Sequence, residues 1–163
     1  LSAAAKSLLN FGGAGGGVIA AKRAIVDKLR NKSRPYLFSN NIIPAVAAVG
    51  IRILERLQES KGLIAKLAEN SLYFRKKIQE AGLTIRPGIH PVIPVMLGDA
   101  KLAASMAKDL VEVEGIYVIA FSFPVVPKGE ARIRVQLSSS HNKGHLDKAI
   151  GAFTRVAKKH GVI

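Results

Sequence analysis

Residues 131–137 alternate between apolar and polar side chains in the order Ala, Arg, Ile, Arg, Val, Gln, Leu. Because successive side chains of a β-strand point to opposite faces, this spacing places Arg132, Arg134 and Gln136 on one face. The other face is apolar throughout and should cover a core. Taken alone, the pattern favours an ordinary half-buried strand with a solvated basic face. A guanidinium fixed on a rigid strand is, however, also a suitable clamp for a small carboxylate.

The rest of the sequence predicts helices and short strands in mixed order. A glycine-rich run at residues 12–17 fits a tight loop that enters a strand and equally fits a flexible end. Pro44 is well placed to begin a long helix with Asn41 or a neighbour near its cap, Gly82 should end the next helix, and Asp99 should cap another. This order predicts an α+β fold with a small, mostly antiparallel sheet covered by helices. The predicted helices cover residues 23–32, a long segment from Pro44, 63–81, 99–113 and 145–160, and the predicted strands cover residues 83–86, 92–97, 116–121 and 131–137.

Two local predictions concern the ends and faces of helices. The first helix should stop before Pro35, because a residue that precedes proline avoids the helical region, and residues 36–41 should form a loop. In the helix at residues 63–81, helical spacing separates an apolar face from a basic one. We expect Leu67, Leu72, Phe74 and Ile78 to face inward and Arg75, Lys76 and Lys77 to face solvent.

Composition and charge limit the classes of partner. The 163 residues are 48% hydrophobic, which is enough for the core of one domain or a large part of one. A net charge of +14 would suit a nucleic-acid partner, but the 25 Lys and Arg residues are scattered and lack interleaved stacking aromatics. We therefore expect no nucleic-acid partner. The most apolar run, residues 42–51, contains Pro44 and is too short to cross a bilayer, so we expect no membrane partner either.

Metal and disulfide sites are not indicated. The sequence contains no cysteine, which excludes a disulfide scaffold and a cysteine metal site. The four histidines, at positions 90, 141, 145 and 160, do not have the spacing of metal ligands. His141 is expected to have a capping or structural role.

Four segments together carry a resemblance to a known family. They follow one another in the family's order and extend over most of the chain. The sequence resembles the C-terminal part of the α-oxoamine synthases, and we expect it to be a portion of a longer protein. The segments are GGAGGG at 12–17, RPYLFSN at 34–40, HPVIPVMLGDA at 90–100 and FPVVPKGEARIRVQLSSSH at 123–141.

The resemblance implies an enzyme with the fold of the type I pyridoxal phosphate proteins, acting as a homodimer with shared active sites. In the most similar branch, glycine and acetyl-coenzyme A are interconverted with 2-amino-3-ketobutyrate and coenzyme A during threonine breakdown, with pyridoxal phosphate as electron sink. Residues 1–43 would be the tail of the large cofactor-binding domain and residues 44–163 the small domain with its leading helix. The implied location is the mitochondrial matrix in a eukaryote and the cytoplasm in a bacterium.

The resemblance also assigns roles to individual residues. Arg134 matches the family arginine that holds the substrate carboxylate, and Arg132 is then a supporting or surface group. Ser39 matches a loop serine that reaches across the dimer interface to the phosphate of the partner's cofactor. A hydroxyl and free backbone amides before a helix start suit a phosphate, although a simple helix-entry turn would look the same. Phe38 is its packing neighbour with a possible backbone contact to the cofactor.

The lysine that binds the cofactor is where the sequence departs from the family pattern. Aligned without gaps from the glycine run, the lysine position falls on Leu9, which cannot form a Schiff base. Lys6, followed by Ser7 and Leu8, resembles the family's Lys-Ala-Leu if three residues are inserted before Gly12. Either Lys6 is the Schiff-base lysine, with its pKa lowered for nucleophilic attack, or the first 11 residues fall outside the pattern and the site is incomplete.

Two alternatives to the glycine enzyme remain open. One is another α-oxoamine synthase, making 8-amino-7-oxononanoate, 5-aminolevulinate or a sphingoid base. The other is a non-catalytic subunit that lost its lysine. This loss would explain why Leu9 stands at the lysine position of the ungapped alignment. The family's stacking histidine and the aspartate that pairs with the cofactor ring belong to sequence upstream of Leu1, so this chain alone would lack most of the cofactor pocket.

Overall fold

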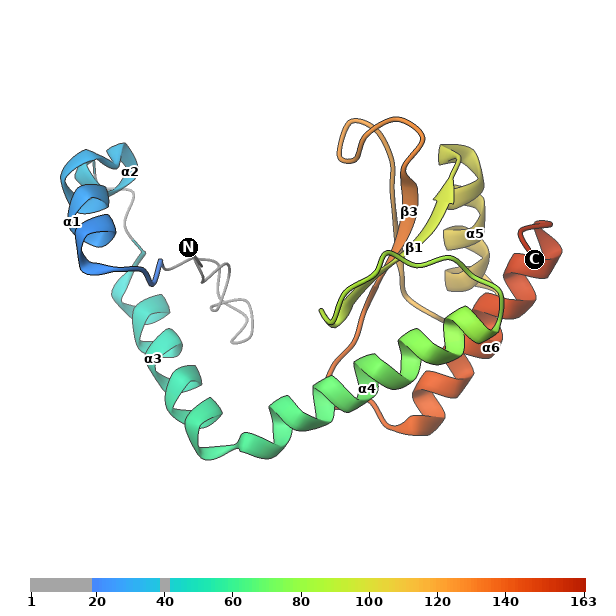
Figure 1. Ribbon diagram of the computed structural model, residues 1–163, viewed down its shortest axis with the longest axis horizontal. Coiled ribbons are helices and arrows are strands. Elements are labelled where there is room, and N and C mark those ends of the chain that lie inside the picture. Colours follow the sequence, from blue (N-terminus) through green and yellow to red (C-terminus); the bar gives the residue numbers. More distant parts are fainter. Residues whose placement is uncertain (1–18, 39–41) are drawn as a thin grey trace. The chain divides into compact units, whose positions relative to one another are not determined.

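The computed structural model describes residues 19–38 and 42–163 (Figure 1). The chain divides into two compact units between Lys61 and Gly62. The described elements of the first unit are helices, and the second unit contains a sheet with helices packed on it (Figure 1). Among the described helices, none combines the length and the apolar character needed to span a membrane.

The described part of the first unit contains α1 (Arg23–Lys32), α2 (Arg34–Leu37) and α3 (Pro44–Glu59). The predicted end of α1 at Lys32 is confirmed, and the Ser33 N–H caps the helix by donating to the Leu29 carbonyl. The predicted cause is wrong, because Arg34, the residue before Pro35, is itself helical and the break lies at the extended Ser33. The prediction of a loop from residue 36 is wrong for Tyr36 and Leu37, which are helical. Pro35 lies in the first turn of α2, where the missing N–H needs no helical partner.

Pro44 begins α3, as predicted from its fixed φ. The residue at the cap is Ile43, whose side chain offers no hydrogen bond, and Asn41 lies outside the described residues. The helix is amphipathic in the predicted register. Its half-buried positions include Val46, Val49, Ile53 and Leu57.

The sheet of the second unit has three strands, β1 (Val92–Gly98), β2 (Ile119–Phe121) and β3 (Ala131–Gln136). Their order is β1-β3-β2, and β3 is antiparallel to both neighbours. The predicted small antiparallel sheet is therefore confirmed. Arg134 lies in the central strand, opposite Pro94 on β1 and Ile119 on β2.

One predicted strand is reduced to a single bridge, and another is shorter than expected. Residues 83–86 form only one bridge, between Ile85 and Val95, so the predicted strand is wrong. Pro87 has no N–H for a ladder, and Gly88 turns the chain away with a φ of 143°. The strand predicted at 116–121 begins only at Ile119, because the Ile116 N–H donates instead to a carbonyl at the end of the preceding helix.

Helices α4 (Lys61–Glu80), α5 (Ala100–Glu112) and α6 (Lys143–Lys159) supply the apolar side chains that cover the sheet. Helix α5 packs on all three strands and on α6. The apolar face of β3 enters this core as predicted, with Ile133 fully buried. The largest fully buried apolar side chains are Phe74, Ile78, Ile93, Val95, Met106, Leu110, Ile133 and Phe153.

The predicted faces of α4 are correct for Phe74 and Ile78 but wrong for two other residues. Leu72 is 62% exposed, whereas Arg75 is only 7% exposed. The Arg75 guanidinium donates to the carbonyls of Arg86 at 3.0 Å and His90 at 2.9 Å. These bonds satisfy two carbonyls in the segment that leads into β1, so the buried guanidinium holds this segment against α4.

Capping side chains mark the starts of α5 and α6, and a glycine marks the end of α4. Asp99 caps α5 by accepting a hydrogen bond from the Leu102 N–H at 2.7 Å, and Gly82 follows α4 with a φ of 92°, both as predicted. Helix α6 starts two residues earlier than expected. Asn142 forms a capping box with His145, which stabilises the additional residues at its start.

An ion-pair cluster at the ends of α5 and α6 makes stability sensitive to acid. Asp109 accepts hydrogen bonds from Lys159 and His160, each at 2.8 Å, and these partners, Lys159 foremost, hold the pKa of its carboxyl below the ordinary value. Because the pKa of Asp109 is lower in the folded state than in the unfolded state, where it is about 3.9, the ionised carboxylate stabilises the fold at pH values above about 3.9. This stabilisation is lost as the pH falls through the folded-state pKa.

We therefore expect the free energy of unfolding to decrease below about pH 4, and Asp109→Asn to flatten this dependence. Urea unfolding followed by circular dichroism between pH 3 and 7 measures both. Lys108→Gln, on an exposed neighbour, is the control. An unchanged slope in Asp109→Asn would show that the cluster contributes nothing to acid sensitivity.

Candidate functional site

The polar face of β3 carries Arg132, Arg134 and Gln136, as the alternation predicts. The Arg132 guanidinium already has hydrogen-bond partners within the protein. Its side chain is 12% exposed, and it donates to the Glu130 carboxylate at 2.8 Å and to the Glu130 carbonyl at 2.9 Å. Arg86 binds the same Glu130 oxygen at 2.7 Å. The two guanidiniums therefore share one internal counter-ion.

Arg134 differs from Arg132 in its partners. It is exposed, and its Nη2 donates to the neutral Gln136 Oε1 at 3.1 Å. Its guanidinium carbon lies 5.9 Å from the centre of the Phe121 ring. Within the described residues Arg134 has no carboxylate at ion-pair distance, so its fork keeps the capacity to bind an external carboxylate through two parallel hydrogen bonds.

Two open depressions meet at Arg134. One, of about 410 Å³, is lined on the β1 side by Arg86, His90 and Pro94 together with Phe121. The other, of about 390 Å³, has a different wall. It is lined by Tyr117, Val118, Ile119, Arg134, Gln136, Leu137, Ser138 and His141.

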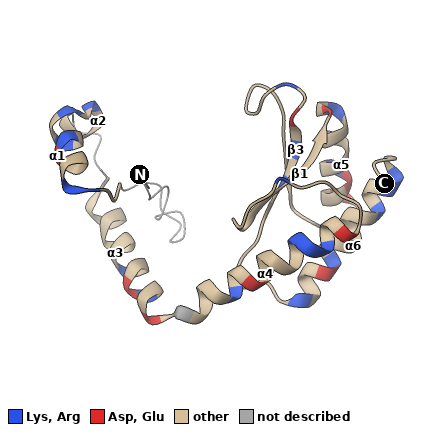
Figure 2. Ribbon diagram, viewed as in Figure 1, with Lys and Arg blue, Asp and Glu red and all other residues tan. Residues whose placement is uncertain are grey.

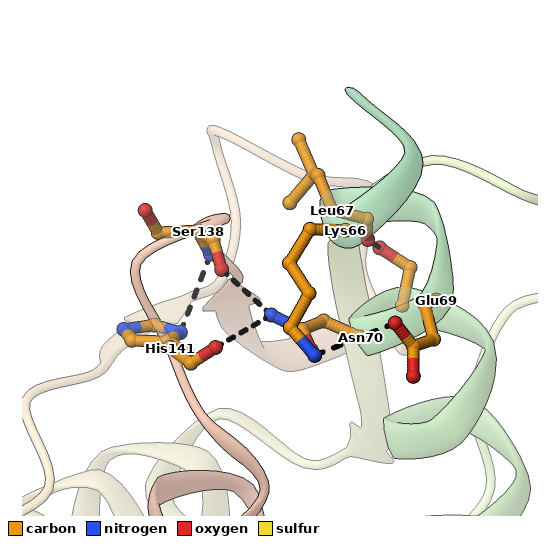
Figure 3. A network of polar contacts seen from close by, with 7 residues as sticks. Lys66, Leu67, Glu69, Asn70, Ser138 and His141 are labelled. Carbon is orange, nitrogen blue, oxygen red and sulfur yellow. Dashed lines mark hydrogen bonds and ion pairs between the residues drawn. The ribbon is translucent and has the colours of Figure 1, made fainter. Parts of the chain in front are cut away.

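The turn that follows β3 is held by Asn70 of α4 (Figure 3). Asn70 is 3% exposed, and its Nδ2 donates to the carbonyls of Ser138 at 3.0 Å and His141 at 2.9 Å. The sequence-based reasoning missed this residue. A signal was present, because Asn70 lies on the inward stripe between Leu67 and Phe74, where a polar side chain must find partners.

The histidines have structural partners. His141 Nδ1 accepts from the Ser138 N–H at 3.3 Å, and His145 completes the cap of α6, in agreement with the structural role predicted for His141. In the part of the chain that the structure describes, no group of three His, Asp or Glu side chains is arranged to hold a metal ion.

Basic and acidic side chains are interspersed on the helices of the second unit, as the blue and red segments of α4 and α6 show (Figure 2). Several form ion pairs. Arg155 binds Glu114 at 2.6 Å and Lys77 binds Glu80 at 2.7 Å. These partners lower the pKa of both carboxyls. The expected absence of a nucleic-acid partner stays a prediction.

The structure describes two of the four residues predicted for the site. Arg134 belongs to the second unit, and Phe38 to the first, where it ends α2 by donating its N–H to the Arg34 carbonyl at 2.9 Å. The Phe38 side chain is 66% exposed. Lys6 and Ser39 lie outside the described residues. The roles predicted for Arg134, Phe38, Lys6 and Ser39 all stay predictions.

The chain is similar to several named enzymes. It is 47% identical over 153 residues to 2-amino-3-ketobutyrate coenzyme A ligase of Escherichia coli K12, covering 94% of this chain and 38% of that protein. The mitochondrial enzyme of the same name from Mus musculus is 46% identical, with 94% and 36% covered. An 8-amino-7-oxononanoate synthase of Thermosipho melanesiensis is 43% identical, with 91% and 38% covered. The predicted resemblance to α-oxoamine synthases is confirmed, and the chain spans less than two fifths of these relatives.

Solved structures share the fold. A serine palmitoyltransferase of Sphingomonas wittichii superposes with a TM-score of 0.80 at 25% identity, covering 93% of this chain and 38% of that one. An 8-amino-7-oxononanoate synthase of Francisella tularensis gives 0.74 at 22% identity, with 93% and 44% covered. The family model for aminotransferase class I and II matches residues 6–153. The chain therefore belongs to the class I and II aminotransferase family.

Proposed function

We propose that the protein containing this chain is a pyridoxal-phosphate-dependent acyltransferase that interconverts glycine plus acetyl-coenzyme A with 2-amino-3-ketobutyrate plus coenzyme A. The identity of 45–47% to relatives named 2-amino-3-ketobutyrate coenzyme A ligase supports this reaction. The observation that carries it in the structure is Arg134, an exposed guanidinium on a central strand whose hydrogen-bond partner is a neutral amide.

Arg134 is proposed to bind the carboxylate of the amino-acid substrate. A planar guanidinium forms two charge-assisted hydrogen bonds with a carboxylate, which fixes its orientation as well as its position. The arginine stays charged throughout the physiological pH range, so binding does not depend on a proton at this group. Because β3 is hydrogen-bonded to a strand on each side, Arg134 projects from a rigid strand. It can therefore hold the α-carbon of the substrate in one position.

Pyridoxal phosphate, when bound, supplies an electron sink for the carbanion at the substrate's α-carbon. We propose that three residues of this sequence serve this chemistry: the Lys6 amine for the aldehyde of the cofactor, the Ser39 hydroxyl for its phosphate, and Arg134 for the substrate. Ser39 and Phe38 are proposed to reach the cofactor of the second subunit in a homodimer. A serine palmitoyltransferase that shares the fold, with a TM-score of 0.83, was solved with a bound pyridoxal phosphate–myriocin aldimine.

The domain division and the cellular location follow the same proposal. Residues 1–43 would belong to the large cofactor-binding domain and residues 44–163 to the small domain. The mouse relative is named a mitochondrial enzyme and the E. coli relative is not. The proposed location is accordingly the mitochondrial matrix if the source is a eukaryote and the cytoplasm if it is a bacterium.

A second candidate is 8-amino-7-oxononanoate synthase, favoured by the 43% identity to the Thermosipho enzyme. A synthase of this kind would use the same carboxylate clamp, because its substrate is also an amino acid. The two candidates differ in the acyl group and in the amino-acid side chain that the site accepts.

The test is a turnover assay on the complete protein saturated with pyridoxal phosphate. Release of coenzyme A from acetyl-coenzyme A is measured with glycine, with other small amino acids, and with longer acyl-coenzyme A donors. We expect release that depends on glycine and is fastest with the acetyl donor. Faster turnover with a longer donor would favour the second candidate, and no release with any pair would overturn the proposed function.

A further inference from the structure

Asn70 uses both hydrogens of its side-chain amide on a turn that is distant in sequence. Its Nδ2 bonds to the carbonyls of Ser138 and His141 join α4 to residues 68 and 71 positions further along the chain (Figure 3). The side chain is almost fully buried, so water does not compete for these hydrogens. A buried amide with both donors satisfied by backbone oxygens is a strong local constraint.

The turn that Asn70 holds is a wall of the depression at Arg134. Ser138 and His141 line it together with Gln136 and Arg134. The turn is also closed internally, because the His141 N–H donates to the Ser138 carbonyl at 3.2 Å and His141 Nδ1 accepts from the Ser138 N–H. It therefore moves as one piece, and Asn70 fixes that piece to α4.

The link from the turn to Arg134 runs through Gln136. The Gln136 amide oxygen is the side-chain partner of Arg134, and Gln136 ends β3 opposite Val92. Beyond it, the Leu137 N–H donates to the Pro91 carbonyl. The next contacts that hold the chain are those of Asn70, so losing them loosens the chain directly after these last ladder bonds, two residues beyond the residue that orients the guanidinium.

We propose that Asn70 is a positioning residue for substrate binding: by fixing the 138–141 turn it fixes Gln136, and through Gln136 the orientation of Arg134 toward a substrate carboxylate. This proposal rests on the function proposed above for Arg134. A displacement of about 1 Å in a substrate-holding group is enough to reduce the rate up to about a hundredfold. The role of Asn70 is therefore visible in kinetics and not only in stability.

The test uses Asn70→Asp in the complete protein with its cofactor. The substitution keeps the shape of the side chain but removes both donors and points a carboxylate at two carbonyl oxygens. We expect KM for glycine to rise about tenfold, with KM for acetyl-coenzyme A within about twofold of the wild type. Met106→Ala is the control, because it opens a cavity in the core on α5 without touching the turn, and should leave both KM values unchanged.

A double-mutant cycle separates this role from general loosening. Gln136→Ala is an exposed change that the fold should tolerate, and it is expected to raise KM for glycine by a similar factor. Because both residues act in series on Arg134, Asn70→Asp combined with Gln136→Ala should be no worse than the poorer single variant. If Asn70→Asp does not fold, the test rests on Gln136→Ala alone. An unchanged KM for glycine in that variant would overturn the proposed link from the 138–141 turn through Gln136 to Arg134.

The outcomes separate this proposal from the proposed function. Equal increases of both KM values in Asn70→Asp, or strictly additive effects in the cycle, overturn the positioning role while the function stands. If Arg134→Ala leaves KM for glycine unchanged, the carboxylate contact itself is wrong. A selective rise in KM for glycine in both Arg134→Ala and Asn70→Asp supports both.

Discussion

Replacing Arg134 with alanine should reduce kcat/KM for glycine by about a thousandfold, mostly through an increase in KM. Two hydrogen bonds to a charged group contribute about 1.5–3 kcal/mol each, and their loss together corresponds to a factor of this size. The carboxylate is bound before and during the reaction, so its loss affects substrate binding more than the chemical step. Steady-state kinetics of the complete protein with varied glycine and saturating acetyl-coenzyme A measures the effect.

Arg132 provides a matched control for this experiment, because it lies on the same strand and face. Its guanidinium already has the Glu130 carboxylate as partner, so it has less capacity for a substrate. We expect Arg134→Lys to raise KM for glycine by at least about tenfold, since an ammonium cannot form the planar fork, and Arg132→Lys to change it much less. Equal effects of the two substitutions would contradict the assignment of the clamp to Arg134.

Replacing Phe74 with alanine should destabilise the second unit by about 3–5 kcal/mol. Phe74 is fully buried between α4 and the rest of the core, so its removal loses apolar contacts and leaves a cavity. Urea unfolding of the protein, monitored by circular dichroism, measures the change. The midpoint should fall while the slope stays the same, because the exposed area on unfolding changes little.

Leu72 is the control for this second prediction, because it lies two residues away on the same helix. With 62% of its surface exposed, Leu72→Ala should change stability by less than about 0.5 kcal/mol. A large loss in Leu72→Ala would mean that this face of α4 is covered in the complete protein. A small loss in Phe74→Ala would contradict the core as the structure describes it.

The parts of the fold that were predictable from sequence have local physical causes. The period of two around Arg134 requires a strand whose alternate side chains are buried, and the structure has this strand at the centre of the sheet. Pro44, Gly82 and Asp99 each specify a helix end through the backbone of a few neighbouring residues. Such signals need no knowledge of distant contacts.

The parts that were missed depend on contacts between distant segments. Arg75 was expected in solvent, because a charged side chain is rarely buried without a partner. Its partners are backbone carbonyls of residues 86 and 90, which sequence patterns do not reveal. The position of Asn70 on the inward stripe indicated that it needs partners, but the partners themselves lie about 70 residues away and could not be read from the pattern. The family resemblance, by contrast, singled out Arg134, and the structure then explained why Arg132 is the weaker candidate.

We propose that this chain supplies part of a working pyridoxal phosphate site. Its most direct test is to saturate the complete protein with the cofactor, reduce it with sodium borohydride, digest it and identify the lysine that retains the pyridoxyl label by mass spectrometry. We expect stoichiometric label on the peptide that contains Lys6, and little label in Lys6→Ala. No retained label in the wild-type protein would contradict the catalytic assignment and favour a non-catalytic subunit.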